Sequence, residues 1–153
     1  MDLVIRPDDL TGEAILALLR YHLDEMHRHS PADSVHALPP ERLRHPDVSF
    51  YSAWYGETLA GCGALREVEP GHGEIKTMRV APATLRKGVG RAILRHLLEE
   101  ARSRGFSRVS LETGSTAPFH PAHALYRAHA FVECAPFADY VLDDFSICMT
   151  LEL

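Results

Sequence analysis

The stretch 73–105 constrains the fold of this chain more than any other part of its sequence. It begins as a β-strand over residues 74–80, passes through a turn that contains Gly88 and Gly90, and continues as a long amphipathic helix. A second strand-like segment follows at residues 107–112. A strand, a helix and another strand in this order require a parallel pair of strands joined by a right-handed crossover.

The turn before this helix has the features of an anion site. Free backbone N–H groups at a helix start, together with the helix dipole, bind phosphate without any side chain. Gly88 and Gly90 let a ligand approach the backbone closely. Arg86, Lys87 and Arg91 surround the same turn with positive charge. The pattern therefore predicts a phosphorylated cofactor.

Two common phosphate-binding motifs do not fit this turn. A Walker loop needs G-x-x-x-x-G-K-[ST], and neither glycine here is followed by Lys-Ser or Lys-Thr. A dinucleotide fingerprint needs G-x-G-x-x-G, and the third glycine is replaced by Ile93. Taken alone, the turn is equally typical of an ordinary tight connection between a strand and a helix.

The same turn resembles the signature of the GNAT acetyltransferases, [QR]-x-x-G-x-[GA] between a strand and a helix. The corresponding residues run from Leu85 to Gly90, with Leu85 in place of the usual Gln or Arg. A second resemblance, to A-x-x-L-Y-x-x-x-G-F, is matched at Ala122, Leu125, Tyr126 and Phe131, with Ala130 in place of the glycine. The two motifs occur in the family's order, and the resemblance covers roughly residues 50–153.

The remaining pattern predicts one domain, residues 1–153, of the α/β class (α+β mixed sheet). The resemblance implies a GNAT-like acyl-CoA N-acyltransferase fold: a central, mostly antiparallel sheet with one parallel splayed strand pair, flanked by helices. Periodicity and turn residues predict the further elements. They are strands at 3–5, 48–55, 59–68, 131–135 and 145–153, helices at 11–28 and 122–129, and a short helix near 40–44.

The resemblance implies acetyl-CoA as the cosubstrate, gripped mainly by backbone groups. The pantetheine arm is expected along Met78, Arg79 and Val80, like an added strand. Two further contacts are expected at Phe119, where many members carry Asn, and at Ala122. The pyrophosphate is expected at the turn, on Arg86, Lys87, Gly88, Val89, Gly90 and Arg91.

Acetyl transfer to an amine requires a base for the amine and an acid for the leaving thiolate. Glu74, fourteen residues before Gly88, has the register of the general base in the histone-acetylating branch of the family. Its structural alternative is an ion pair with Lys76 or a loop arginine. The resemblance places Tyr126 beside the cofactor sulfur as the general acid, and the alternative is a core tyrosine.

The acceptor is expected near His27, Ser30, Ser34 and His36, because the family recognises substrates with its first helix and the following loop. A solvated polar loop is the alternative. No metal is expected, because His120-x-x-His123 has no accompanying Glu-x-x-His helix. The three cysteines, Cys62, Cys134 and Cys148, share no metal or disulfide spacing.

These observations favour an acetyl-CoA-dependent N-acetyltransferase that acts on the amine of a small molecule. The alternatives are an enzyme that acetylates a protein Lys or N-terminus, and a non-catalytic acyl-CoA-binding module. A formal charge of −5 without a Lys/Arg block argues against a nucleic-acid partner. No apolar run has membrane-spanning length and no signal peptide is evident, so a cytoplasmic location is expected. The resemblance to the family suggests a homodimer.

Overall fold

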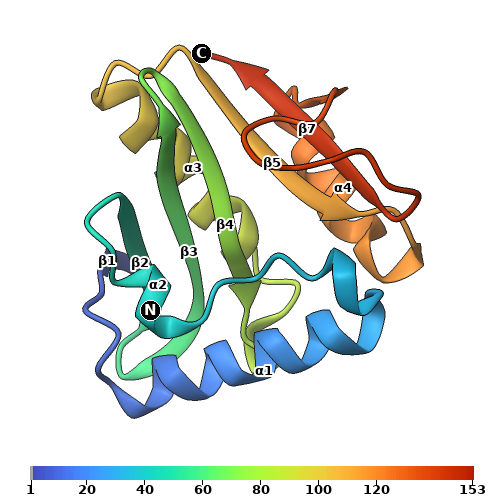
Figure 1. The fold of residues 1–153 in the computed structure, drawn as a ribbon. Helices are drawn as coiled ribbons and strands as arrows, with labels where there is room; N and C mark the ends of the chain where they lie inside the picture. The colour runs from blue at the N-terminus through green and yellow to red at the C-terminus, as the bar shows by residue number, and fades with distance from the viewer. Residues whose placement is uncertain (1) are drawn as a thin grey trace.

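The computed structural model describes residues 2–153, which form a seven-stranded sheet with helices on both faces (Figure 1). The strands are β1 (Leu3–Pro7), β2 (Val48–Tyr55), β3 (Thr58–Glu69), β4 (His72–Val80), β5 (Arg108–Gly114), β6 (Val132–Cys134) and β7 (Ser146–Glu152). The helices are α1 (Glu13–His29), α2 (Pro40–Leu43), α3 (Val89–Ser103) and α4 (His120–Ala128), with single 3-10 turns η1 (Ala32–Ser34), η2 (Pro82–Thr84) and η3 (Ala117–Phe119).

The predicted fold class is confirmed. The strand order is β1-β2-β3-β4-β5-β7-β6, and β4 with β5 is a parallel pair inside a sheet whose other pairs are antiparallel. The strand–helix–strand unit is therefore formed by β4, α3 and β5, as the sequence requires. The predicted short helix near 40–44 is α2.

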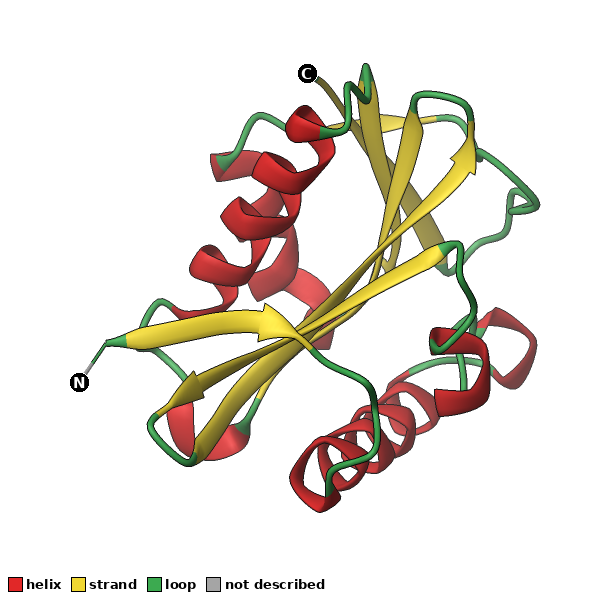
Figure 2. Ribbon diagram, turned by 90° about the vertical axis from the view of Figure 1, so that its left-hand side faces the viewer, coloured by secondary structure: helices red, strands yellow, loops and turns green. Residues whose placement is uncertain are grey.

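Two apolar cores lie on opposite faces of the sheet (Figure 2). The larger one holds the apolar faces of α3 and α4, and the smaller one holds α1 and α2. Helix α3 packs closely on β3 because Gly63 has no side chain: a Cβ there would lie 2.7 Å from Ile93 Cγ2. Within residues 2–153, no helix has the length and apolar character needed to cross a membrane.

The parallel pair is short, and the two strands then separate. Strands β4 and β5 pair only at His72 with Arg108, Gly73 with Val109 and Glu74 with Ser110. Beyond that point they diverge towards α1, which passes beneath the open end of the gap (Figure 1). The edge of β4 after Glu74 therefore faces the gap without a strand partner.

A β-bulge in the separated part of β4 changes which side chains face α1. Cys62 of β3 pairs with Arg79, whereas Ala64 pairs with Lys76, so β4 carries one extra residue between them. Thr77 lies inside this bulge with φ 54°, a left-handed conformation that is unusual for a β-branched residue. Because of the extra residue, Lys76 and Arg79 lie on the same face although they are three positions apart.

Candidate active site

A cavity of about 250 Å³ lies where β4 and β5 diverge. Its walls come from both strands, from one face of α1, from α4 and from the loop that contains His36. Tyr140, in the connection between β6 and β7, closes one side. Segments from both halves of the chain therefore meet around a single space at the centre of the sheet.

Tyr126 of α4 lies on the wall nearest α3. Its side chain is buried, packs against Phe131 with ring centroids 5.8 Å apart, and also lines the cavity. Burial raises the pKa of the phenol to about 12, so it stays protonated near neutral pH and can donate a proton. Phe119 and Ala122 line the same end. Tyr126 is thus a core tyrosine and a cavity residue at once.

The start of α3 lies beside this wall and has the shape of an anion site. Arg86 and Gly88 adopt left-handed conformations, with φ 63° and 80°, which turn the chain into the helix. Val89 is buried in the core, so only its backbone is available to a ligand. A Cβ on Gly90 would make ordinary contacts, 3.4 Å from Val80 Cγ2 and 3.6 Å from Leu125 Cδ2. Packing within the protein therefore does not require a glycine at position 90. Close approach of a ligand to the backbone would explain the glycine.

The expected cofactor residues come together along one path. Met78 and Arg79 line the cavity, and Val80 lies next to Gly90 at the start of α3. The unpaired edge of β4 offers N–H and C=O groups to a strand-like ligand with amides. The side chains of Arg86, Lys87 and Arg91 are exposed around the helix start. These residues fit an acyl-CoA whose arm lies along β4 and whose pyrophosphate lies at α3.

Glu74 lies beneath the point where the strands separate and does not itself line the cavity. Its side chain is 1% exposed. The Tyr140 hydroxyl donates a hydrogen bond to it, Lys76 Nζ lies 3.4 Å from Oε2, and Arg66 Nη2 lies 3.5 Å from Oε1. The structural ion pair with Lys76 is therefore present. Glu74 reaches the cavity only through Tyr140 and Lys76.

Glu112 of β5 is a carboxylate of the cavity wall that the sequence pattern did not single out. It is half-buried and lines the cavity. Burial raises the pKa of its carboxyl group, while a hydrogen bond from Ser146 and the nearby charges of His36 and Lys76 act in the opposite direction. Strand alternation from Ser110, which pairs with Glu74, would have placed Glu112 on the same face.

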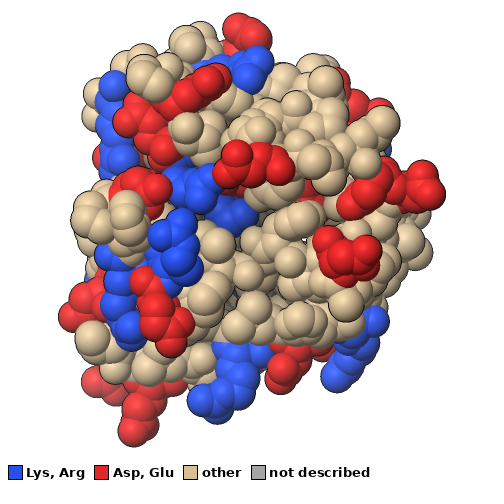
Figure 3. Space-filling view, viewed as in Figure 1, with Lys and Arg blue, Asp and Glu red and all other residues tan. Residues whose placement is uncertain are grey.

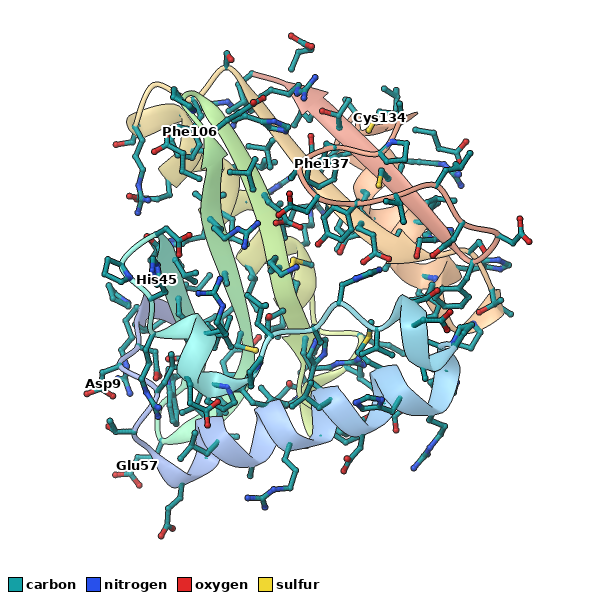
Figure 4. All side chains as sticks on the ribbon, in the orientation of Figure 1. Asp9, His45, Glu57, Phe106, Cys134 and Phe137 are labelled. Carbon is teal, nitrogen blue, oxygen red and sulfur yellow. The ribbon has the colours of Figure 1, made fainter. Side chains whose placement is uncertain are left out.

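Tyr140 was also missed, because it belongs to a segment without regular structure. We call residues 135–145, between β6 and β7, the strap. Tyr140 accepts a hydrogen bond from Lys76 Nζ at 2.7 Å and packs edge-on against His36, with ring centroids 5.1 Å apart. Phe137, labelled in Figure 4, is buried and packs against Tyr140 with ring centroids 5.1 Å apart. The aromatic side chains hold the strap over the cavity.

The four residues expected at the acceptor lie in different places. His36 lines the cavity. Ser34 is buried, and its hydroxyl donates to Asp143 of the strap at 3.0 Å. Ser30 has a buried hydroxyl without a partner among residues 2–153, and His27 is exposed on the outer side of α1.

The face of α1 that lines the cavity has helical spacing. It carries His22, Glu25, Met26 and His29. This spacing of three and four residues was visible in the sequence and would have selected His22 and His29 instead of His27.

The face of the molecule seen in Figure 3 carries mixed charge. Acidic and basic side chains are interspersed over this face (Figure 3). Within residues 2–153, no three His, Cys, Asp or Glu side chains are grouped so that they could hold a metal ion.

The fold and this cavity define an acyl-CoA-type acyltransferase, and comparisons with known proteins identify the family. The model of the acetyltransferase (GNAT) family matches residues 15–131. The chain belongs to this family and is an acetyltransferase.

Two relatives align with nearly the whole chain. The uncharacterized N-acetyltransferase YsnE of Bacillus subtilis is 52% identical over 149 residues, which cover 97% of this chain and 99% of the relative. The uncharacterized N-acetyltransferase YedL of Escherichia coli is 50% identical over 149 residues, which cover 97% of this chain and 94% of the relative. A Bacillus subtilis acetyltransferase solved in complex with CoA has the same fold, with a TM-score of 0.71, 20% identity and 99% of both chains covered.

Proposed function

We propose that this protein is an acetyl-CoA-dependent N-acetyltransferase that acetylates the amine of a small molecule by direct attack on the thioester. One observation carries the proposal: the cavity at the separation of β4 and β5 has Tyr126 on one wall and Glu112 on another. It is continuous with the unpaired edge of β4, which leads to the anion site at α3. A thioester and an amine can therefore meet between an acid and a base.

Glu112 and Tyr126 each carry out one of the proton transfers. Acetyl-CoA supplies the activated acetyl group when it is bound. Glu112 takes the proton of the acceptor ammonium, a role that suits a carboxylate whose pKa is raised by burial. The amine nitrogen then forms a bond to the acetyl carbon, and the C–S bond breaks. Tyr126 donates its proton to the departing sulfur. The positively charged nitrogen of the adduct then loses its second proton, which restores the Tyr126 phenol, so the products are the neutral amide, the CoA thiol and a protonated Glu112. Backbone N–H groups of the β4 bulge are the proposed donors to the oxyanion.

Glu74 is the alternative base. It is linked to the cavity through the Tyr140 hydroxyl, so it would act by relay: Tyr140 accepts the proton of the amine while passing its own to Glu74. The same contacts also suit a positioning role, in which Glu74 holds Lys76 and Tyr140 in place. The pH profiles of the two carboxylate variants distinguish these roles.

Contacts between segments on either side of the cavity favour a small acceptor over a peptide. The loop after α1 and the strap are joined across the cavity by the hydrogen bond from Ser34 to Asp143 and by the packing of His36 on Tyr140. These contacts narrow the space that a protein lysine or N-terminus would need. An enzyme that acetylates peptides is therefore the second candidate.

The first experiment is isothermal titration of the protein with acetyl-CoA, with NAD and ATP as controls. Selective binding of acetyl-CoA is expected, followed by release of CoA thiol when small amines are added. Absence of acetyl-CoA binding in a folded sample contradicts the proposal. Binding without thiol release for any amine or lysine peptide would instead indicate a non-catalytic acyl-CoA-binding module.

A further inference from the structure

The cavity contains an arginine whose charge is not neutralised by the protein. Arg79 of β4 lines the cavity on the side of α1. Its Nε donates a hydrogen bond to His22 Nδ1 at 2.9 Å, and its guanidinium carbon lies 5.6 Å from the centre of the Tyr21 ring. Within residues 2–153, no carboxylate oxygen lies within the 4.0 Å of an ion pair with Arg79. The guanidinium is fixed but keeps its full charge.

His22 orients Arg79 without cancelling this charge. His22 is buried, and its pKa is lowered to about 3 by burial and by the charge of Arg79, so the imidazole is neutral at physiological pH. Because Nδ1 accepts the hydrogen bond, the proton of the ring lies on Nε2. An aspartate in this place would hold the guanidinium equally well but would neutralise it. The neutral imidazole leaves the two terminal nitrogens of Arg79 available to another anion.

The other cation of the cavity is already engaged. Lys76 Nζ lies 3.4 Å from the carboxylate of Glu74 and donates to the hydroxyl of Tyr140 at 2.7 Å. The pyrophosphate of CoA has its own site at the start of α3, whereas Arg79 faces α1. On β5, Glu112 contributes a carboxylate to the same cavity. Glu25 of α1 also lines the cavity, but it lies 3.3 Å from Arg28 and 3.0 Å from His29. Among residues 2–153, the cavity thus offers one cation and one carboxylate that have no ion-pair partner, Arg79 and Glu112, to an acceptor.

We infer that the acceptor is an amine that also carries a carboxylate, such as an α-amino acid, and that Arg79 binds this carboxylate. The planar guanidinium matches the two oxygens of a carboxylate and can donate two parallel hydrogen bonds. Glu112 receives the ammonium group of the same molecule. This inference rests on the proposed function and adds the chemical class of the acceptor. Arg79 is then a specificity-determining residue.

The test uses pairs of acceptors that differ only in this charge. Each common amino acid is compared with its carboxamide in the thiol-release assay, with wild-type protein, Arg79→Gln and Arg79→Lys. Arg127→Gln, at an exposed arginine outside the cavity, is the matched control. Wild-type kcat/KM is expected to be about 100-fold higher for the best acid than for its amide. Arg79→Gln should remove this preference, mainly through KM, by lowering kcat/KM for the acid far more than for its amide.

Three results overturn the inference. The first is equal kcat/KM for acids and amides with wild-type protein. The second is an equal loss for both in Arg79→Gln, which would indicate that Arg79 only clamps α1 to the sheet. If no amino acid is turned over, N-acetylglycine is titrated into the protein saturated with CoA. The third result that overturns the inference is that N-acetylglycine does not bind, or that it binds equally well to Arg79→Gln. Binding of acetyl-CoA is measured separately, so failure of the inference is distinguished from failure of the proposed function.

Discussion

The proposed cofactor side and the proposed acceptor side of the cavity are built in different ways. On the cofactor side, one continuous segment from β4 through the turn to α3 presents mainly backbone groups. On the acceptor side, side chains from α1, β4, β5 and the strap meet, and several of their contacts join residues more than 55 positions apart, such as Arg79 with His22 and Lys76 with Tyr140. A backbone site tolerates changes in side chains, whereas a side-chain site depends on each contact.

The largest effect is expected on the cofactor side, from Gly90→Leu. A side chain at position 90 fills the space next to the start of α3, so acetyl-CoA affinity should fall by about 100-fold or more, which equals ~2.7 kcal/mol. The melting temperature should fall less than in Gly63→Ala, because the Cβ at position 90 makes only ordinary contacts. Calorimetry and thermal unfolding check the two expectations.

Gly63→Ala is the control for this prediction. Its Cβ would lie 2.7 Å from Ile93 Cγ2 and 3.2 Å from Leu97 Cδ1, so α3 must shift. Overpacking of this kind costs about 1–3 kcal/mol of unfolding free energy. Stability should therefore fall in Gly63→Ala, while the folded protein still binds acetyl-CoA. An unchanged acetyl-CoA affinity in Gly90→Leu would contradict the assignment of the phosphate site.

The next effect concerns the base. Glu112→Gln should lower kcat/KM by about 100-fold and leave acetyl-CoA affinity unchanged. In the wild type, activity should rise with pH through the raised pKa of Glu112, because the base must be deprotonated, and this limb should disappear in the variant. Glu74→Gln is the comparison. If the acidic limb is lost in Glu74→Gln instead, the base is Glu74, acting through Tyr140.

The raised pKa of Glu112 also predicts that the stability of the fold changes with pH. A carboxyl group whose pKa is raised in the folded state stabilises the fold at low pH, and this contribution is lost as pH rises through the folded-state value. Glu112→Gln should therefore raise the melting temperature at pH 7 relative to the wild type, and the difference should vanish towards pH 3. Thermal unfolding at both pH values checks this. A difference that grows towards low pH would show that the folded-state pKa of Glu112 is lowered instead of raised.

A smaller effect is expected from Tyr126→Phe. Loss of the proton donor should lower kcat by about 10-fold or more, with acetyl-CoA affinity nearly unchanged. Tyr51→Phe, at a buried tyrosine of β2 outside the cavity, is the matched control. Because the phenol has a pKa of about 12, activity should not gain a limb below pH 9 from this residue. Normal turnover in the variant removes Tyr126 as the acid.

The smallest effect tests the contact that encloses the acceptor. Ser34→Ala removes the 3.0 Å hydrogen bond to Asp143, which contributes about 1 kcal/mol. The KM for a small acceptor should rise roughly fivefold, with kcat and acetyl-CoA affinity unchanged. Ser103→Ala, at the exposed end of α3, is the control. A variant that gains activity on lysine peptides would favour the second candidate function, because opening the strap would then admit the substrate.

Local sequence patterns were enough to predict the parts of this protein that depend on a single segment. Hydrophobic spacing predicted α3, and the strand–helix–strand order required the parallel pairing of β4 with β5. Gly88 and Gly90 marked the turn before α3, and the structure places Gly88 there in a left-handed conformation. Each of these signals depends on neighbours within one segment. The fold class could therefore be predicted from the sequence, whereas the cofactor path is an expectation that the family resemblance supplied.

The proposed acceptor side depends on contacts between distant segments, which local patterns do not predict. The extra residue in the β4 bulge turns Arg79 towards His22, and simple alternation along the strand does not predict this. Tyr140 meets Glu74 across 66 positions of sequence, from a segment without regular structure. Such contacts depend on where the chain brings distant segments together, because an isolated tyrosine or glutamate carries no local signal of its partner. The arrangement of distant segments around the sheet therefore determines which of the candidate carboxylates and histidines face the cavity.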